Sequence, residues 1–246
     1  PSPGDSGLWS SDFYGPLVKS AGGNRYGSVW ASHHTGLVLV GFHKQKSDGV
    51  PWFMEHLADF EQVAGGITTL RTDNGELASK QMETFCATQG ISRQLTAPHS
   101  SFQNGRAERE IRTLRAHAGA SLSRSGLPAS FWANAVRHCV YVQNRLPKAT
   151  TSSAYQRAFG SAPTLRLVHP FGCLALSRVP HPVKSRLATR SRQAIHLGPA
   201  EQTKDAFHIV HLDTRSVAVS RDLVFFDAEF PYNLDSKPTQ PLSNAG

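Results

Sequence analysis

Three acidic residues lie where segments of regular structure are expected to end or begin. Asp12 is near the end of a predicted strand, Asp73 directly follows another, and Glu108 lies in the first turns of a predicted helix. Strand ends in a sheet flanked by helices can converge on one edge, where clefts form. Three carboxylates that meet there repel one another unless cations lie among them, and their hard oxygens suit Mg²⁺ or Mn²⁺ better than zinc. Two such ions, about 4 Å apart, can activate a hydroxyl and hold a phosphate, so these residues predict a site for phosphoryl transfer.

Each acid has a simpler interpretation when it is taken alone. Asp12 precedes a Gly-Pro turn and Asp73 lies in Asp-Asn-Gly, and both contexts are typical of turns. Glu108 is followed at spacings of four and seven by Arg112 and Arg115, which places the three on one face of a helix. This combination suits a group that holds a metal beside a phosphate backbone, but a surface helix with ion pairs would have the same pattern.

Acidic residues are missing from a long stretch of the chain. The 246 residues carry a formal net charge of +8. Residues 111–200 contain 13 Lys and Arg and no Asp or Glu, whereas the rest of the chain has a net charge of −5. Because ordinary protein surfaces mix the two signs, this separation predicts a polyanionic partner, and nucleic acid in the first place. Chance composition in an Arg-, Ser- and Ala-rich sequence is the alternative.

Composition disfavours several classes of protein. No apolar run approaches the roughly 18 residues that a membrane span requires. Cys86, Cys139 and Cys173 are far apart and have no metal-ligand spacing, so we expect reduced core thiols in an intracellular protein and no zinc site. The chain begins with neither a methionine nor a signal peptide, and we expect it to be a piece of a longer protein.

The first 147 residues have the pattern of an α/β fold. Alternating residues predict three strands joined by short Gly-rich turns, and helical spacings then alternate with two further strands. The expected strands are residues 7–13, 26–31, 37–42, 67–72 and 91–95, and the expected helices are 47–63, 79–89, about 103–124 and a last helix that Pro128 opens. A meander followed by strand, helix, strand and helix implies a mixed sheet with helices on its faces.

The composition changes after Pro147. Residues 148–168 are rich in Ser, Thr, Pro and Arg and are expected to form a linker. Five short strands are expected at 174–179, 193–197, 206–212, 216–219 and 223–226, which suggests a small β-barrel module, and the tail from 231 to 246 is expected to be disordered. A basic run in this module could follow a phosphate backbone, although a solvated charged edge is an equal interpretation; its members are Arg178, Lys184, Arg186, Arg190 and Arg192.

Two separated motifs indicate a family that the chain resembles. Leu-Arg-Thr-Asp-Asn-Gly-Glu at 70–76 and Pro-His-Ser-Ser-Phe-Gln-Asn-Gly-Arg-Ala-Glu-Arg at 98–109 are similar to the integrase core of copia-type LTR retrotransposons. Segment 11–16 resembles that family's first catalytic aspartate and its Gly-Pro turn. Further similar segments are 127–136 and 144–147 in the next helix, and 169–173, 197–198 and 220–225 in an SH3-like module. The resemblance spans about residues 8–228.

The resemblance implies a fold and a set of site residues. The fold is a ribonuclease-H-like mixed five-stranded sheet flanked by helices over residues 1–147, followed by the SH3-like module over 169–230. The implied catalytic and metal-binding triad is Asp12, Asp73 and Glu108. By the same resemblance the triad holds two Mg²⁺ or Mn²⁺ ions, and Asp12 contacts both of them. Residues at positions that touch the DNA end in related integrases are Asn104, Arg112 and Arg115, which the helical period places on the side of Glu108.

The implied activity is insertion of the element's DNA into target DNA. The resemblance also implies further copies of the chain and other Pol polyprotein domains as partners, no membrane, and a location in the nucleus or a virus-like particle. The family typically reads Asp-Asn-Gly-Gly-Glu followed by an aromatic residue, whereas this chain is one Gly short and continues with Leu77. A decayed or co-opted copy that only binds nucleic acid is therefore the alternative function, and a structure-selective nuclease of the same fold is a third.

Overall fold

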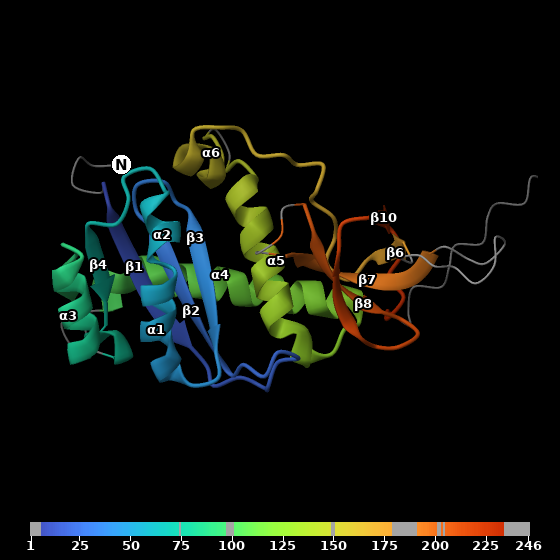
Figure 1. Ribbon diagram of the computed structural model, residues 1–246, viewed down its shortest axis with the longest axis horizontal. Helices are drawn as coiled ribbons and strands as arrows, with labels where there is room; N and C mark the ends of the chain where they lie inside the picture. Colours follow the sequence, from blue (N-terminus) through green and yellow to red (C-terminus); the bar gives the residue numbers. More distant parts are fainter. Residues whose placement is uncertain are drawn as a thin grey trace, which may run out of the picture. The chain divides into compact units, whose positions relative to one another are not determined.

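The chain folds into two compact units, each built on its own five-stranded sheet (Figure 1). The computed structural model describes residues 6–73, 75–96, 101–148, 151–178, 191–200, 203 and 205–233, with the backbone alone at 101–103. The first unit consists of residues 1–118 and 129–165, and the second of residues 119–128 and 166–246.

The sheet of the first unit is mixed. Its order is β3-β2-β1-β4-β5, and its strands are Leu8–Tyr14 (β1), Tyr26–Ser32 (β2), Val38–His43 (β3), Thr69–Thr72 (β4) and Ser92–Leu95 (β5). Strands β1, β2 and β3 form an antiparallel meander, whereas β4 runs parallel to β1 and β5 parallel to β4. Parallel neighbours need crossover connections, which helices supply here. The predicted α/β fold with a mixed five-stranded sheet flanked by helices is confirmed.

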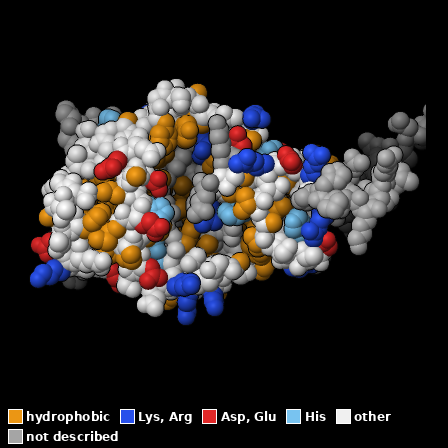
Figure 2. Space-filling model, in the orientation of Figure 1, with side chains coloured by type: hydrophobic (Ala, Val, Ile, Leu, Met, Phe, Trp, Pro, Cys, Tyr) orange, Lys and Arg blue, Asp and Glu red, His pale blue; other side chains and the backbone are white. Residues whose placement is uncertain are grey.

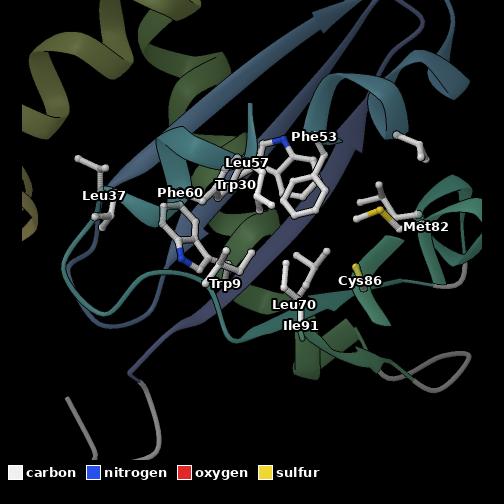
Figure 3. Packing of buried hydrophobic residues seen from close by; sticks show 14 of the residues in the cluster. Trp9, Trp30, Leu37, Phe53, Leu57, Phe60, Leu70, Met82, Cys86 and Ile91 are labelled. Atoms are coloured by element: carbon white, nitrogen blue, oxygen red, sulfur yellow. The ribbon is translucent and has the colours of Figure 1, made fainter. Parts of the chain in front are cut away.

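Alternation along β1 divides its side chains between the two faces of the sheet. Trp9 belongs to the core cluster on one face (Figure 3). Phe13 is partly buried and packs against that cluster. In that cluster Trp30 stacks on Phe53 with ring centroids 4.8 Å apart. Asp12 and Tyr14 alternate with Trp9 and Phe13, so they project from the opposite face.

The core face is covered by short helices. They are the 3-10 helix η2 (Lys46–Asp48), α1 (Gly49–Glu55), α2 (Leu57–Glu61) and α3 (Lys80–Thr88). A single helix was predicted over 47–63, and the structure instead leaves helical geometry at His56, with φ −102° and ψ 12°. The His56 ring stacks on Trp52, and its Nδ1 lies 2.9 Å from the Trp52 carbonyl oxygen. These contacts stabilise the end of α1 at His56. The helical spacing of apolar residues alone does not predict this break.

The opposite face carries the long helix α4 (Ser101–Ser125), which lies behind the sheet in Figure 1. Its buried stripe consists of Asn104, Ala107, Ile111, Leu114 and Ala118. Helix α5 (Trp132–Arg145) follows after the 3-10 turn η4 (Ala129–Phe131). Trp132 on α5 packs edge-on against Tyr14, with ring centroids 6.0 Å apart. The side of the sheet from which Asp12 projects is thus a helix-packed face.

The segment expected to be a linker contains a helix. Helix α6 (Ala154–Phe159) begins at Ser153, whose Oγ accepts a hydrogen bond from the Gln156 N–H at 3.1 Å, and ends at Gly160 with φ 74°. Ala158 of this helix belongs to the core cluster of the first unit. The Ser N-cap and the left-handed Gly are local signals for the two ends of this helix. The polar composition of the segment suggested a linker instead.

The second unit is an antiparallel sheet of order β10-β6-β7-β8-β9. Its strands are Leu174–Arg178 (β6), Ser191–Pro199 (β7), Phe207–His211 (β8), Val217–Ser220 (β9) and Leu223–Phe226 (β10), as the sequence predicted to within a few residues. Cys86, Cys139 and Cys173 are buried in the two units, as expected for core thiols. Of the expected disordered tail, residues 231–233 are described and Asn233 donates to the Arg124 carbonyl at 2.9 Å, while 234–246 lie outside the described residues. No helix within the described part of the chain is both long and apolar enough to cross a membrane.

Candidate functional site

Strand pairing brings Asp12 and Asp73 to the same edge of the first sheet. In the parallel pair β1–β4, Trp9 is opposite Leu70 and Ser10 is opposite Arg71. Continuing that register by two positions places Asp12 beside Asp73, directly after β4. Asp73 is exposed, and its Oδ1 accepts a hydrogen bond from the Gly75 N–H at 3.1 Å. Continued in this way, the pairing directs both acids to one edge of the sheet, and their convergence in one site stays a prediction.

Helix α4 brings Glu108 to the same region. One turn before Glu108, the side-chain amide of Asn104 donates from Nδ2 to the Ser11 carbonyl at 3.1 Å. Asn104 is 3% exposed, so this bond attaches the start of the helix to β1 next to Asp12. Asn104 was expected to touch DNA, but in the free protein its side chain points into the first unit. Glu108 itself is half-buried.

The charges of Asp73 and Glu108 act on Asp12. The pKa of Asp12 is raised from 3.8 to about 6, chiefly by burial and to a smaller extent by the negative charges of Asp73 and Glu108, against the lowering effect of the Phe13 N–H and of Lys46. That N–H donates to Asp12 Oδ1 at 2.7 Å. Acids from β1, from the loop after β4 and from α4 thus share one electrostatic environment, which is typical of functional carboxylate sites.

Two charged residues that sequence reasoning missed accompany this site. Lys46 Nζ lies 2.8 Å from Glu76 Oε2, and this bond, followed by the charges of Glu76, Asp73 and Asp12, raises the pKa of the lysine. Lys46 follows β3, and Glu76 begins the 3-10 helix η3 (Glu76–Ala78) just after Asp73. Thirty residues separate the two in sequence, so no local pattern could have predicted their contact.

The donor set fits a hard divalent cation by its chemistry. Three carboxylates supply oxygen ligands, and their mutual repulsion is relieved when a cation lies among them. In the arrangement seen here, however, no three His, Cys, Asp or Glu side chains among the described residues are gathered closely enough to hold a metal ion. Asp12, Asp73 and Glu108 are therefore neighbours whose side chains would need to draw closer to coordinate one ion together.

Arginines of α4 lie along the flank of its buried stripe. Arg112 and Arg115 are exposed, and the positive charge of Arg115 acts on the phenol of buried Tyr14, whose pKa burial raises. Tyr14 is two residues from Asp12 on the same face of β1, so Arg115 lies on the side of the carboxylates. The other face of the sheet, over α1 and α2, carries acidic side chains scattered among hydrophobic ones (Figure 2).

Comparison with known proteins finds transposon polyproteins. Residues 173–239 match the family described as the retroviral polymerase SH3-like domain. The chain is 30% identical over 224 residues, 89% of its length, to the retrovirus-related Pol polyprotein from transposon TNT 1-94 of Nicotiana tabacum. It is 29% identical over 226 residues, 91% of its length, to the retrovirus-related Pol polyprotein from transposon RE1 of Arabidopsis thaliana. The chain is related to the Pol polyproteins of transposons.

This Pol-related chain spans only a part of its relatives. It covers 17% of the tobacco polyprotein and 15% of the Arabidopsis one. Among solved structures, it is similar to a chain of the simian T-cell lymphotropic virus intasome in complex with PP2A regulatory subunit B56 gamma, with a TM-score of 0.53 and 18% identity over 89% of this chain and 78% of that chain. At this identity the likeness establishes a common fold. The resemblance to retrotransposon Pol proteins that the motifs predicted is confirmed.

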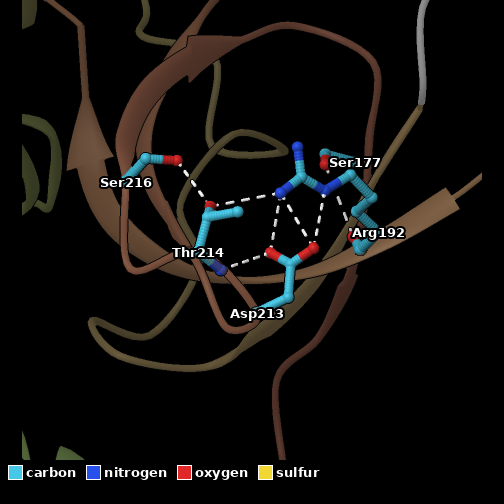
Figure 4. A network of polar contacts seen from close by, with 5 residues as sticks. All are labelled: Ser177, Arg192, Asp213, Thr214 and Ser216. Carbon is cyan, nitrogen blue, oxygen red and sulfur yellow. Dashed lines mark hydrogen bonds and ion pairs between the residues drawn. The ribbon is translucent and has the colours of Figure 1, made fainter.

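The SH3-like domain of the Pol-related chain contains part of the predicted basic run. Arg192 forms a two-pronged ion pair with Asp213, whose oxygens lie 2.7 and 2.9 Å from Nη2, and the same nitrogen donates to Thr214 at 3.1 Å (Figure 4). The Arg192 bond holds the pKa of Asp213 near 2. Arg178 is exposed, whereas Lys184, Arg186 and Arg190 lie outside the described residues. For Arg192 the contacts favour a structural role over a phosphate contact.

Proposed function

We propose that this chain is the catalytic core and SH3-like part of a retrotransposon integrase, which inserts element DNA into target DNA by divalent-metal-dependent strand transfer. The observation that carries the proposal is that the β1–β4 register leads on to Asp12 and Asp73, while the Asn104 bond to Ser11 holds α4, which carries Glu108, against the same strand. Acids from separate elements that lie near one another at a sheet edge are typical of functional sites, and a cation relieves their repulsion. The relationship to transposon Pol polyproteins and the fold common with an intasome chain support the same function.

The proposed chemistry needs no covalent nucleophile from the protein. A 3′-hydroxyl of the element DNA attacks a target phosphodiester in line, a new phosphorus–oxygen bond forms, and the 3′ oxygen of the target strand leaves. Asp12, Asp73 and Glu108 would hold two Mg²⁺ or Mn²⁺ ions, and such ions lower the pKa of the attacking hydroxyl and neutralise charge on the phosphate. Asp12 can supply an oxygen ligand at neutral pH because its pKa of about 6 leaves it largely ionised.

The DNA would be held by phosphate contacts. We assign these to the exposed Arg112 and Arg115 on α4 and, in the SH3-like domain, to Arg178, Lys184 and Arg186. Their contribution should fall as salt rises, because each contact releases counterions from the DNA. Asn104 is assigned a positioning role instead, since its amide holds α4 against β1.

The proposal includes further partners. Concerted insertion requires two element ends to be handled together, so the chain is expected to work as a multimer. Other Pol domains would be joined to it in the polyprotein, and the reaction would take place where target DNA is found, in the nucleus, after passage through a virus-like particle.

Replacement of the acids tests the proposal. Asp73→Asn and Glu108→Gln should each reduce Mg²⁺-dependent joining of an oligonucleotide end to a plasmid by about a hundredfold or more, because each removes a charged oxygen ligand from the reacting centre. The matched control is Asp59→Asn on the exposed side of α2, which should join as the unmodified chain does. Circular dichroism checks that each variant is folded. Undiminished joining by either triad variant would rule out the proposed site.

A second function, DNA binding without catalysis, is favoured by the shortened loop after Asp73 and by the Lys46 charge beside the acids. Calorimetric titration with Mg²⁺ separates the two functions. A working site should take up the ion in a manner that Asp73→Asn abolishes, whereas a binding-only copy should show no carboxylate-dependent uptake. Product analysis for DNA that is cut but not joined would instead indicate a nuclease.

A further inference from the structure

An ion pair connects the exit of β3 to the loop that carries Asp73. Lys46 begins η2, and Glu76 begins η3, with Nζ and Oε2 2.8 Å apart. The two side chains are 39% and 34% exposed, so neither is fully solvated. The residue before each of them is also hydrogen-bonded. The Gln45 N–H donates to Asp48 at 2.9 Å, and the Gly75 N–H donates to Asp73 at 3.1 Å. The ammonium group of Lys46 is therefore held at a defined place.

That place lies beside the carboxylate site. The partner of Lys46, Glu76, is three residues after Asp73, whose Oδ1 accepts from the Gly75 N–H at 3.1 Å. Lys46 Nζ also lies 5.9 Å from the centroid of the Phe13 ring, on the core face of the sheet. The charge of Lys46 acts on Asp12 together with those of Asp73 and Glu108. The charges of Glu76, Asp73 and Asp12 in turn raise the pKa of Lys46, and Glu76 has the largest effect. Lys46 is thus a positive charge next to the loop of Asp73, and its charge acts on two of the acids to which the proposed function assigns divalent cations.

We propose that Lys46 is a positioning residue that sets the divalent-ion affinity of the Asp12–Asp73–Glu108 site, and that Glu76 holds its ammonium group to one side. The inference rests on the proposed function, since it concerns the same site. Lys46 offsets part of the repulsion among the acids before an ion arrives. The lysine then repels the incoming ion, and the bond to Glu76 limits that repulsion by keeping the ammonium away from the ligand oxygens.

Mn²⁺ binding without DNA tests the inference directly. Isothermal calorimetry at about 0.1 M salt should find that Lys46→Met binds Mn²⁺ about threefold to tenfold more tightly than the unmodified chain, because a positive charge within one screening length is removed. The matched control is Lys44→Met, an exposed lysine two residues earlier that loses the same charge. Its affinity should stay within about twofold of the unmodified chain.

Glu76→Gln separates the holding role from a simple change of charge. This variant should weaken Mn²⁺ binding, since the released ammonium moves towards the acids and a negative charge is also lost. In the Lys46→Met background only the lost charge remains, so the effect of Glu76→Gln should be clearly smaller. A double-mutant cycle measures this difference, and additive effects would contradict the holding role.

Three results would overturn the inference. If the unmodified chain takes up no Mn²⁺ that Asp73→Asn abolishes, the proposed site is wrong and this inference fails with it. If uptake is present but Lys46→Met and Lys44→Met bind alike, the inference alone is wrong. If Lys46→Met leaves Mn²⁺ affinity unchanged but weakens duplex binding in EDTA more than Lys44→Met, the lysine is a phosphate contact instead. Circular dichroism establishes that each variant is folded.

Discussion

Asp12 is a carboxylate whose charge the folded chain disfavours. Burial is the largest cause of its raised pKa, and the neighbouring acids add to it. Because the folded pKa of about 6 lies above the unfolded value of 3.8, the protonated side chain is compatible with folding and the ionised one opposes it. The stability that Asp12 contributes is therefore fully present below pH 3.8 and is lost as the pH rises through about 6.

Asp12→Asn should remove this dependence. In EDTA at pH 7.5 the variant is expected to unfold with a free energy higher than that of the unmodified chain by up to about 2 kcal/mol, and the difference should vanish near pH 4. Asparagine keeps an oxygen that can accept the Phe13 N–H, so the change in charge is isolated. Urea unfolding at the two pH values measures the difference in free energy of unfolding between the variant and the unmodified chain. The titration of His43 is common to both proteins and cancels in that difference. An equal difference at both pH values would contradict the assigned pKa.

At the scale of elements, one side chain attaches helix α5 to the edge strand of the first sheet. Asn144 Oδ1 accepts from the Val38 N–H at 3.0 Å, and its Nδ2 donates to the Val38 carbonyl at 2.7 Å. Both residues are buried. Strand β3 is an edge strand, so the amide takes the place of a neighbouring strand at that position. The packing of α5 against the sheet thus depends on a polar contact within an apolar layer.

Asn144→Ala should lower the free energy of unfolding of the first unit by about 2–4 kcal/mol, because a buried N–H and a buried carbonyl lose their partner. Gln143→Ala is the neighbouring control. It breaks one partly buried bond, from Nε2 to Glu110 Oε2 at 2.7 Å, and should cost less. Chemical denaturation measures the free energy of unfolding of both variants. Equal losses of this free energy would show that the bonds to Val38 contribute no more than the Gln143 bond does.

At the scale of the whole molecule, helix α4 contributes to both compact units. Its last turns, from residue 119, belong to the second unit. There Arg124 lies over the Phe230 ring at 4.7 Å, and Gly126 ends the helix with φ +69°. A Cβ at Gly126 would lie 2.3 Å from the Tyr232 carbonyl oxygen, so only glycine fits. The SH3-like unit is therefore completed by a segment that precedes it by about 40 residues of sequence.

Gly126→Ala should destabilise the second unit by about 2 kcal/mol or more, through the left-handed conformation and the contact with Tyr232. Hydrogen exchange measured by mass spectrometry should become faster in β7 and β8 and remain unchanged in β1 and β2. The control is Gly119→Ala, where nothing lies within 4 Å of the added carbon. That helical position should gain about 0.5–1 kcal/mol. Faster exchange in β1 and β2 as well would mean that the two units do not unfold separately.

The sequence by itself determined the order and type of nearly all elements. Strand alternation, helical period and the glycine at 126 are local signals, so they were readable without coordinates. The positions of Asp12 and Asp73 near strand ends, and of Glu108 in the first turns of a helix, follow from the same signals. The break at His56 and helix α6 were missed because a ring contact and a short capped helix leave little trace in the period.

Only the tertiary structure decided how the site residues meet. The parallel register of β1 and β4 directs Asp12 and Asp73 to one edge of the sheet, the Asn104 amide turns inward to β1, and Lys46 reaches Glu76. These contacts join segments about 30 to 90 residues apart, and the strength of each charge interaction depends on burial and distance in space. Neither quantity is encoded in the spacing of residues along the chain, which is why the motif predicted the acids but not the lysine that pairs with Glu76.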